Sequence, residues 1–216
     1  MRKKLLDSAL DVLRLKGYAA TTVDDICRAA GVTKGSFFHY FDTKEALAIA
    51  AADHFGGMAA GLFAAAPYHL HADPVDRLLG YVDFRIALLE GSLCDVSCLF
   101  GTFVQELYET HPAIRAAAER HMRGHVAELA KDVAAAKAKY APDAPWSADG
   151  VAFNMQAVLQ GALVMAKATL ETQVAAESLG HLRHYLEVLF NRPGPHPNPN
   201  RTELIPSQPS LEGGLS

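Results

Sequence analysis

The 216-residue chain has few of the features that mark disulfide-rich or membrane-spanning proteins. It contains three cysteines, an odd number that does not make a disulfide framework in a chain of this length. No uncharged apolar run approaches the roughly 18 to 20 residues that a membrane helix needs. No small-residue cleavage site follows the basic start at residues 1–4. We therefore expect a cytoplasmic protein with reduced thiols and no membrane partner.

Catalytic and cofactor motifs are also missing. The chain has no glycine-rich nucleotide loop, no zinc-hydrolase helix motif and no credible Ser-His-Asp spacing. Two histidine pairs, His69 with His71 and His121 with His125, are candidate metal ligands. The first pair lacks a nearby cysteine or acid cluster, and histidines one helical turn apart are ordinary surface neighbours. The sequence therefore predicts no enzyme, no cofactor and no metal site.

The chain is rich in apolar residues, and its charge is unevenly distributed. Half of the residues are hydrophobic, so a substantial core can be buried. Residues 1–44 carry eight Lys or Arg and five Asp, whereas the remainder carries twelve basic and nineteen acidic residues. A basic first segment on an acidic body is typical of a protein that presents one end to DNA phosphates.

The stretch from 21 to 44, TTVDDICRAAGVTKGSFFHYFDTK, predicts two short helices joined by a tight turn. Thr22 is placed to cap the first helix, whose apolar residues recur at helical spacing. Gly31 suits the left-handed conformation that ends a helix, and Thr33 is placed to cap the second helix. A helix, a glycine-containing turn and a second helix form the helix-turn-helix pattern, whose second helix enters the DNA major groove.

Helical periodicity continues along the chain and predicts an all-α fold. A first amphipathic helix should end at Gly17. Further helices are expected over about 44–66, 74–90, 93–107, 147–172 and 174–190, with a long helix from 112 to the loop at 141–147. Six of the eleven prolines lie in the final stretch, 193–216, which we expect to be disordered or extended.

The segment GVTKGSFFHYFDTKEAL, with TTVDDICRAA ahead of it, resembles the TetR family of one-component repressors. The close resemblance covers about residues 5–47. It implies a homodimer in which three N-terminal helices bind DNA and a larger all-helical domain binds a small-molecule effector. We accordingly expect a DNA-binding domain over 1–46, an effector-binding and dimerisation domain over 47–192, and the proline-rich tail over 193–216. The resemblance further implies that the last two helices pair across a two-fold axis.

The resemblance also implies which residues contact a palindromic, double-stranded operator. Lys34 and Gly35 match positions that meet base edges, where a lysine donates to guanine and a glycine lets the backbone approach. Phe38 stands where the family commonly has tyrosine. The expected DNA-binding residues are Thr22, Thr33, Lys34, Gly35, Ser36, Phe38, His39, Tyr40 and Lys44.

The expected helix over 93–107 combines apolar residues with Cys98, Thr102 and Gln105. Such polar groups either bond to neighbouring backbone or face a ligand, since an unpaired buried amide costs about 1–3 kcal/mol. The run CLFGTFVQE, followed by HPAIR, resembles the branch of electrophile-responsive repressors of the N-ethylmaleimide type. In that branch the cysteine that matches Cys98 is the sensor. Ser97 departs from the glycine that the branch commonly has there.

Two effector mechanisms are compatible with the sequence. Either an electrophile reacts at Cys98, or a hydrophobic small molecule binds reversibly with no cysteine chemistry. A sensor cysteine needs access and a stabilised thiolate, whereas many free cysteines are buried and inert. The residues expected around the effector are Cys98, Phe103, Gln105, Tyr108, His121, Trp146 and Met155.

Overall fold

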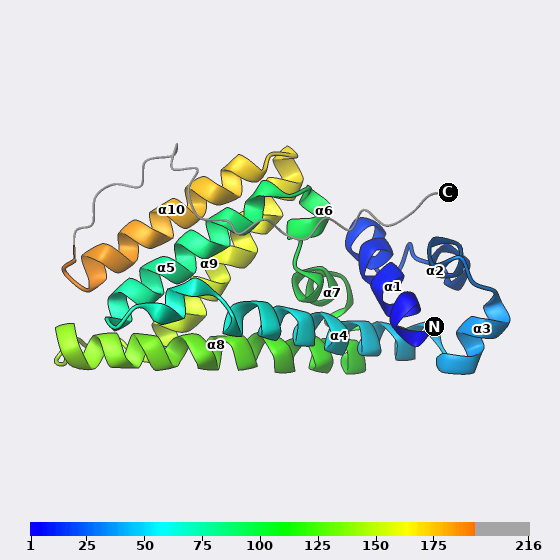
Figure 1. Ribbon diagram of the computed structural model, residues 1–216, viewed down its shortest axis with the longest axis horizontal. Helices are drawn as coiled ribbons and strands as arrows, with labels where there is room; N and C mark the ends of the chain where they lie inside the picture. The colour runs from blue at the N-terminus through cyan, green and yellow to red at the C-terminus, as the bar shows by residue number, and fades with distance from the viewer. Residues whose placement is uncertain (193–216) are drawn as a thin grey trace.

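The computed structural model describes residues 1–192, without the side chains of residues 93 and 94. Over those residues the chain forms helices, turns and bends with no strand, so the predicted all-α fold is confirmed. The predicted tail, 193–216, lies outside the described residues. Figure 1 shows an elongated arrangement, with the N-terminal helices at one end and the later, yellow and orange helices at the other.

Three short helices form the N-terminal end, which we call the head. They are α1 (Arg2–Lys16), α2 (Val23–Ala30) and α3 (Lys34–Tyr40). The hydroxyl oxygens of Thr22 and Thr33 each accept a hydrogen bond from the backbone N–H three residues later, as predicted. Gly31 ends α2 in the left-handed conformation with φ of 59°. The helix-turn-helix expected from the sequence is therefore present.

Two long helices run side by side from the head toward the other end of the molecule (Figure 1). They are α4 (Lys44–Ala64), capped by Thr43, and α8 (Pro112–Tyr140). A Cβ atom built at Gly56 on α4 would lie 2.3 Å from Nδ1 of His121 on α8. The His121 ring stacks on Phe100, and its Nε2 lies 2.8 Å from Oδ1 of Asp53. The absence of a side chain at Gly56 therefore permits the close approach of the two helices.

In the far part of the molecule, which we call the body, two further helices pack against α8 and a third packs against those two. The two are α5 (Pro74–Ala87) and α9 (Ala148–Thr169), and the third is α10 (Thr172–Leu189), with short 3-10 helices η1 (Pro67–Leu70) and η2 (Leu88–Glu90). Their apolar faces share one core, whose most buried members include Leu78, Val133, Met155, Leu179 and Leu186.

The stretch predicted as one helix over 93–107 is two helices, so that expectation was wrong. They are α6 (Leu93–Val96) and α7 (Leu99–Leu107). Between them Ser97 is buried, and Cys98 has an extended backbone with φ of −81° and ψ of 114°. Periodicity did not reveal the break because apolar residues continue on both sides of it. Cys98 therefore stands at the start of α7.

A second apolar cluster joins the head to α7 and to the beginning of α8. It contains Leu13, Ile26 and Phe37 from the head, with Phe103 from α7 and Ile114 from α8. Figure 1 shows α7 lying between the head and the body. The head is thus anchored on α7 and α8 as well as on α4. The domain boundary between residues 46 and 47 stays a prediction.

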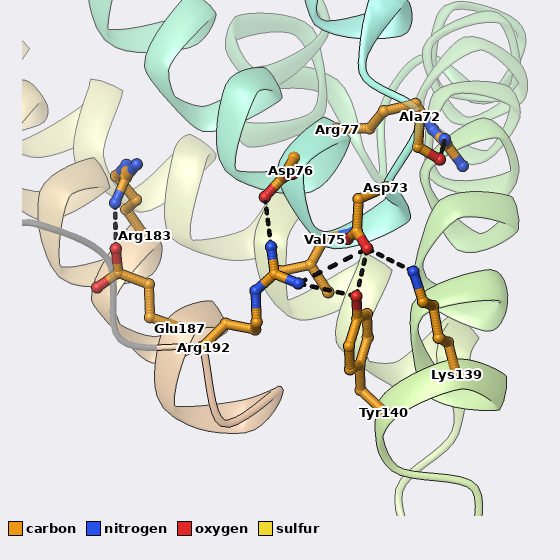
Figure 2. Close-up of polar contacts among 10 residues, drawn as sticks. All are labelled: Ala72, Asp73, Val75, Asp76, Arg77, Lys139, Tyr140, Arg183, Glu187 and Arg192. Carbon is orange, nitrogen blue, oxygen red and sulfur yellow. Dashed lines mark hydrogen bonds and ion pairs between the residues drawn. The ribbon is translucent and has the colours of Figure 1, made fainter.

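A polar network closes the end of the body that is far from the head (Figure 2). Asp73 accepts hydrogen bonds from Tyr140 and from Lys139 at 2.7 Å, and Arg192 lies 3.6 Å from the same carboxylate. Arg192 also donates to Asp76 at 3.0 Å. Although burial raises the pKa of Asp73, the bonds from Lys139 and Tyr140 hold that pKa well below its usual range. The network ties the start of α5 to the ends of α8 and α10.

One segment, Lys44–Leu70, is long and apolar enough to span a membrane by length and composition, although it includes the charged residues Lys44, Glu45 and Asp53. A single helix of this kind is weak evidence, because core helices pass the same test. Here α4, which makes up most of the segment, packs against α1 and α8.

Alanine substitutions at Gly56 and Gly57 should have opposite effects on stability. In Gly56→Ala the new methyl group meets the fixed His121 ring, and we expect a loss of about 1–3 kcal/mol from overpacking. In Gly57→Ala the methyl group meets nothing within 4 Å. That variant should gain up to about 1 kcal/mol from helix propensity. Urea unfolding followed by circular dichroism measures both, and equal effects would contradict the close approach at Gly56.

Candidate functional site

The side chains predicted to bind DNA are concentrated on α3 and at the starts of neighbouring helices. Phe38 is 52% exposed and Tyr40 is 39% exposed, although large aromatic groups are usually well buried. His39 is exposed between them. Phe37 is fully buried and anchors the helix from its inner side. This helix therefore presents aromatic rings and hydrogen-bonding groups to the solvent.

The first turn of α3 is open to an approaching partner. Lys34 is exposed and forms an ion pair with Asp24 at 2.9 Å, a surface contact of a kind that contributes little to stability. A Cβ atom built at Gly35 would meet only Oγ1 of Thr33, at an ordinary distance of 3.7 Å. The Thr33 hydroxyl is engaged in the cap and lies 3.2 Å from Oγ of Ser36. The fold itself does not require glycine at position 35.

Thr22 and Lys44 are among the residues predicted to bind DNA, where the family resemblance implies contacts to phosphates or sugars. In the structure both are engaged within the head. Thr22 donates through its backbone N–H and its hydroxyl to Asp25, and these bonds lower the pKa of that carboxyl to about 2. The ammonium of Lys44 donates to the carbonyl oxygens of Tyr18, at 3.0 Å, and Thr21, at 2.9 Å. Since an ammonium carries three protons, Lys44 keeps one for another acceptor. Phosphate or sugar contacts by both residues stay predictions.

Five of the residues predicted around an effector are spread over the molecule. Met155 is buried in the body core, Trp146 packs against the end of α10, and Tyr108 is 63% exposed. Phe103 lies in the apolar cluster beneath the head, and His121 lies between α4 and α8. None of the five lines the hollows beside Cys98 that are described next.

Cys98 and Gln105 lie at the contact between α7 and α9, which we call the α7 seam. A hollow of about 10 Å³ is lined by Cys98, Gly101, Thr102, Gln105, Gln160, Leu163, Val164 and Lys167. An open groove of about 290 Å³ adjoins it and is lined by Thr102, Gln105, Glu106, Val164 and Lys167. Sequence reasoning placed Met155 of α9 near the effector but missed the α9 residues that line these hollows. Lys167 is the one basic residue of that apolar helix and is the signal that could have indicated them.

Two polar side chains of the α7 seam, Thr102 and Gln105, bond to backbone carbonyl groups of neighbouring residues. The amide of Gln105 donates to the carbonyl four residues earlier at 2.9 Å, and the Thr102 hydroxyl donates to the carbonyl of Cys98 at 3.3 Å. The sequence left open whether Thr102 and Gln105 bond to neighbouring backbone or face a ligand. The structure has the backbone bonds. Lys167 donates to Oγ1 of Thr102 at 3.1 Å and so links α9 to α7. Cys98 is partly exposed and packs against both apolar clusters.

The side chains of His121 and His125 bond to separate protein partners. His125 lies 2.9 Å from the hydroxyl oxygen of Tyr81, whereas His121 bonds to Asp53. Burial, together with the nearby Arg85 guanidinium, lowers the pKa of His125 to about 3. Within the described part of the chain, no group of three or more His, Cys, Asp or Glu side chains is placed to hold a metal ion.

Two protein-family models together match most of the chain. Residues 5–51 match the model described as "Bacterial regulatory proteins, tetR family", and residues 74–182 match "Tetracyclin repressor-like, C-terminal domain". The chain belongs to the TetR family. The first match contains the head with its helix-turn-helix, and the second contains most of the body together with α7.

Individual relatives of this TetR-family protein are DNA-binding regulators. The HTH-type transcriptional repressor DhaR of Mycobacterium sp. (strain GP1) is 30% identical over 115 residues, which are 53% of this chain and 56% of that repressor. The chain thus spans about half the length of this relative.

Solved structures of regulators share the fold over nearly the whole chain. A TetR-family transcriptional regulator from Cytophaga hutchinsonii is 25% identical, with a TM-score of 0.76 over 87% of this chain and 93% of its own. The reduced form of E. coli NemR is 21% identical, with a TM-score of 0.74 over 85% of this chain and 95% of its own. At that identity the NemR likeness concerns the fold alone.

Ionisation of His125 should make the body sensitive to mild acid. Its pKa of about 3 in the folded protein lies below the ordinary value of 6.5, so the unfolded chain takes up the proton first as the pH falls. The stability that neutral His125 contributes is complete above the ordinary pKa and is lost as the pH falls from there toward 3. We expect the free energy of unfolding to drop by about 1–2 kcal/mol between about pH 6.5 and pH 5.

The test is urea unfolding across this pH range, with His125→Gln beside the wild type. Glutamine keeps a hydrogen-bonding group near Tyr81 but does not ionise, so this variant should show a flatter pH dependence. His71→Gln, which changes an exposed histidine, is the matched control and should keep the wild-type slope. Identical slopes in all three proteins would exclude His125 as the source.

Proposed function

We propose that this TetR-family protein is a homodimeric repressor that binds a palindromic operator through α3 and is released when an electrophile reacts at Cys98. The DNA-binding part rests on one observation. A helix anchored by buried Phe37 and capped by Thr33 presents Lys34, His39 and Tyr40 to the solvent. A second helix of a helix-turn-helix that is exposed in this way is suited to the major groove.

Exposed apolar side chains on α9 and α10 support the dimer. The larger ones are Phe153, Val164, Met165, Tyr185 and Val188, which are 38–66% exposed. The two helices pack against each other, and exposed apolar side chains gathered on neighbouring elements commonly mark an interface. Most homodimers bury the same patch of both copies across a two-fold axis. Such a dimer presents two α3 helices to successive major grooves about 34–36 Å apart, which is why the operator is expected to be palindromic.

The position of Cys98 supports the sensor role. It is partly exposed and directly precedes the first turn of α7. The ammonium of Lys167 borders the same hollow. With N-ethylmaleimide, the thiolate adds to the ring double bond and the neighbouring ring carbon takes up a proton, so no group leaves. A hollow of about 10 Å³ holds about one water, so an adduct that occupies it displaces α7 from α9.

Reversible release without cysteine chemistry is the second candidate, and the groove beside the hollow favours it. Its volume of about 290 Å³ approaches that of small-ligand sites, and Cys98 does not line it. Four of its five lining residues are polar or charged. A ligand there would be amphipathic, in place of the purely hydrophobic molecule expected from the sequence.

Lys34→Ala should weaken specific operator binding by about tenfold or more, since a good base contact contributes about 1–3 kcal/mol. Fluorescence anisotropy with labelled upstream DNA measures the affinity, beside a scrambled duplex. Lys131→Ala, which removes an exposed lysine of α8, is the control and should bind like the wild type. Unchanged affinity in Lys34→Ala would count against this placement of the recognition helix.

Cys98→Ser should abolish the response to N-ethylmaleimide. We expect the wild type and Cys94→Ser to release labelled upstream DNA after treatment, whereas Cys98→Ser should hold it. Serine is nearly isosteric but does not react with the maleimide, so operator binding before treatment should be unaltered. Equal release from all three proteins would exclude Cys98 as the sensor and favour the reversible ligand.

A further inference from the structure

The C-terminal end of α7 carries a contact that joins the α7 seam to the head. The carboxylate of Glu106 accepts hydrogen bonds from the backbone N–H groups of Tyr18, at 2.7 Å, and Ala19, at 2.6 Å. Both donors belong to the turn between α1 and α2. Hydrogen bonds to an ionised carboxylate are roughly twice as strong as neutral ones. This side chain is therefore a substantial link between α7 and the turn.

The turn is shaped around that carboxylate. Gly17 ends α1 with φ of 77°, a conformation that other residues rarely adopt. A Cβ atom built there would lie 2.8 Å from Oε2 of Glu106. The glycine thus turns the chain so that two successive N–H groups face one acceptor, and it leaves room for that acceptor.

A charge of opposite sign holds the other side of the same turn. Lys44 at the start of α4 donates to the carbonyl oxygens of Tyr18 and Thr21, and its ammonium lies 4.1 Å from the centre of the Tyr18 ring. We call this arrangement the Tyr18 clasp, meaning Glu106 and Lys44 with the turn that they hold. The backbone N–H of Tyr18 therefore bonds to Glu106 of α7, and its carbonyl oxygen bonds to Lys44 of α4.

The clasp lies next to both the DNA-binding and the effector-binding parts. Thr22, which caps α2, directly follows the clasped turn, and α2 in turn supports α3. Glu106 also lines the groove of the α7 seam. The helix that carries it begins after Cys98 and is nine residues long, a rigid rod of about 13 Å. A displacement at the Cys98 end is therefore transmitted to the carboxylate.

We propose that Glu106 positions the head for DNA binding and transmits to it a change at the α7 seam. When an adduct at Cys98 or a ligand in the groove displaces α7, the carboxylate leaves the amides of Tyr18 and Ala19. The turn before α2 then loses its fixed conformation, and α3 is no longer held in its DNA-binding position. The transmission step rests on the proposed function, whereas the positioning role does not depend on cysteine chemistry.

The experiment measures operator affinity before and after N-ethylmaleimide for the full chain and three variants. Glu106→Ala should bind the operator about tenfold more weakly, because two charge-assisted bonds are lost. Glu106→Gln keeps an acceptor oxygen without the charge and should recover part of the affinity. Glu109→Ala, which removes an exposed acid three residues further on, should bind like the wild type.

The decisive readout is the factor by which N-ethylmaleimide weakens binding. In Glu106→Ala the clasp is already open, so that factor should fall from its wild-type value toward one. A residue with a purely structural role would lower the affinity and leave the factor unchanged. Wild-type affinity in Glu106→Ala, or an unchanged factor, would overturn the proposal.

Amide hydrogen exchange at Tyr18 and Ala19 separates this inference from the sensor proposal. Both amides should be protected in the wild type and should exchange much faster in Glu106→Ala, with the helix content by circular dichroism preserved. If the wild type ignores N-ethylmaleimide, the sensor proposal fails, while affinity and exchange still decide the positioning role. Slow exchange at both amides in Glu106→Ala would then exclude the clasp.

Discussion

The hold of Glu106 on two backbone amides is the interaction on which the placement of the head depends. The half-buried N–H of Tyr18 needs an acceptor, and it shares with the exposed N–H of Ala19 a carboxylate on a helix far away in the sequence. Apolar packing below that turn, with Phe103 and Leu107 facing the head, supplies attraction but little direction. The carboxylate supplies the direction, because two hydrogen bonds to one group fix both the distance and the angle of approach.

The body is held together in a different way from the α7 seam. At its far end, Asp73 and Arg192 join three helices through charged hydrogen bonds, and Glu187 is buried against Arg183 (Figure 2). At the seam, α7 is short, is preceded by a break at Cys98, and contacts α9 through single bonds such as that of Lys167. The contact of α7 with α9 therefore contains fewer charged hydrogen bonds than the far end of the body, whereas the buried side chains of α7, Leu99 and Phe103 among them, pack beneath the head. The contact with fewer charged hydrogen bonds is thus the one next to the head.

Local rules were sufficient to predict the head from the sequence, and they failed where contacts between distant segments decide the structure. The caps at Thr22 and Thr33 and the turn at Gly31 follow from side chains within three residues of each helix end. The break before α7 was missed because apolar periodicity is the same on both sides of it. Trp146 and Met155 were expected near the effector because periodicity identifies an apolar face but not the helix that covers it. The bond from Glu106 to Tyr18 joins residues 88 apart, and no local pattern indicates it.

The fold requires glycine at position 17 but not at position 35, and this difference affects how the family can diversify. At position 17 both the backbone conformation and the neighbouring carboxylate exclude a side chain, so a substitution there damages the fold itself. At position 35 the fold has room for one, and only a partner lying against α3 is affected by it. A substitution at position 35 can therefore change the preferred operator without destabilising the fold, so no earlier stabilising substitution is needed. At this position the evolution of DNA sequence preference is independent of the requirement to fold.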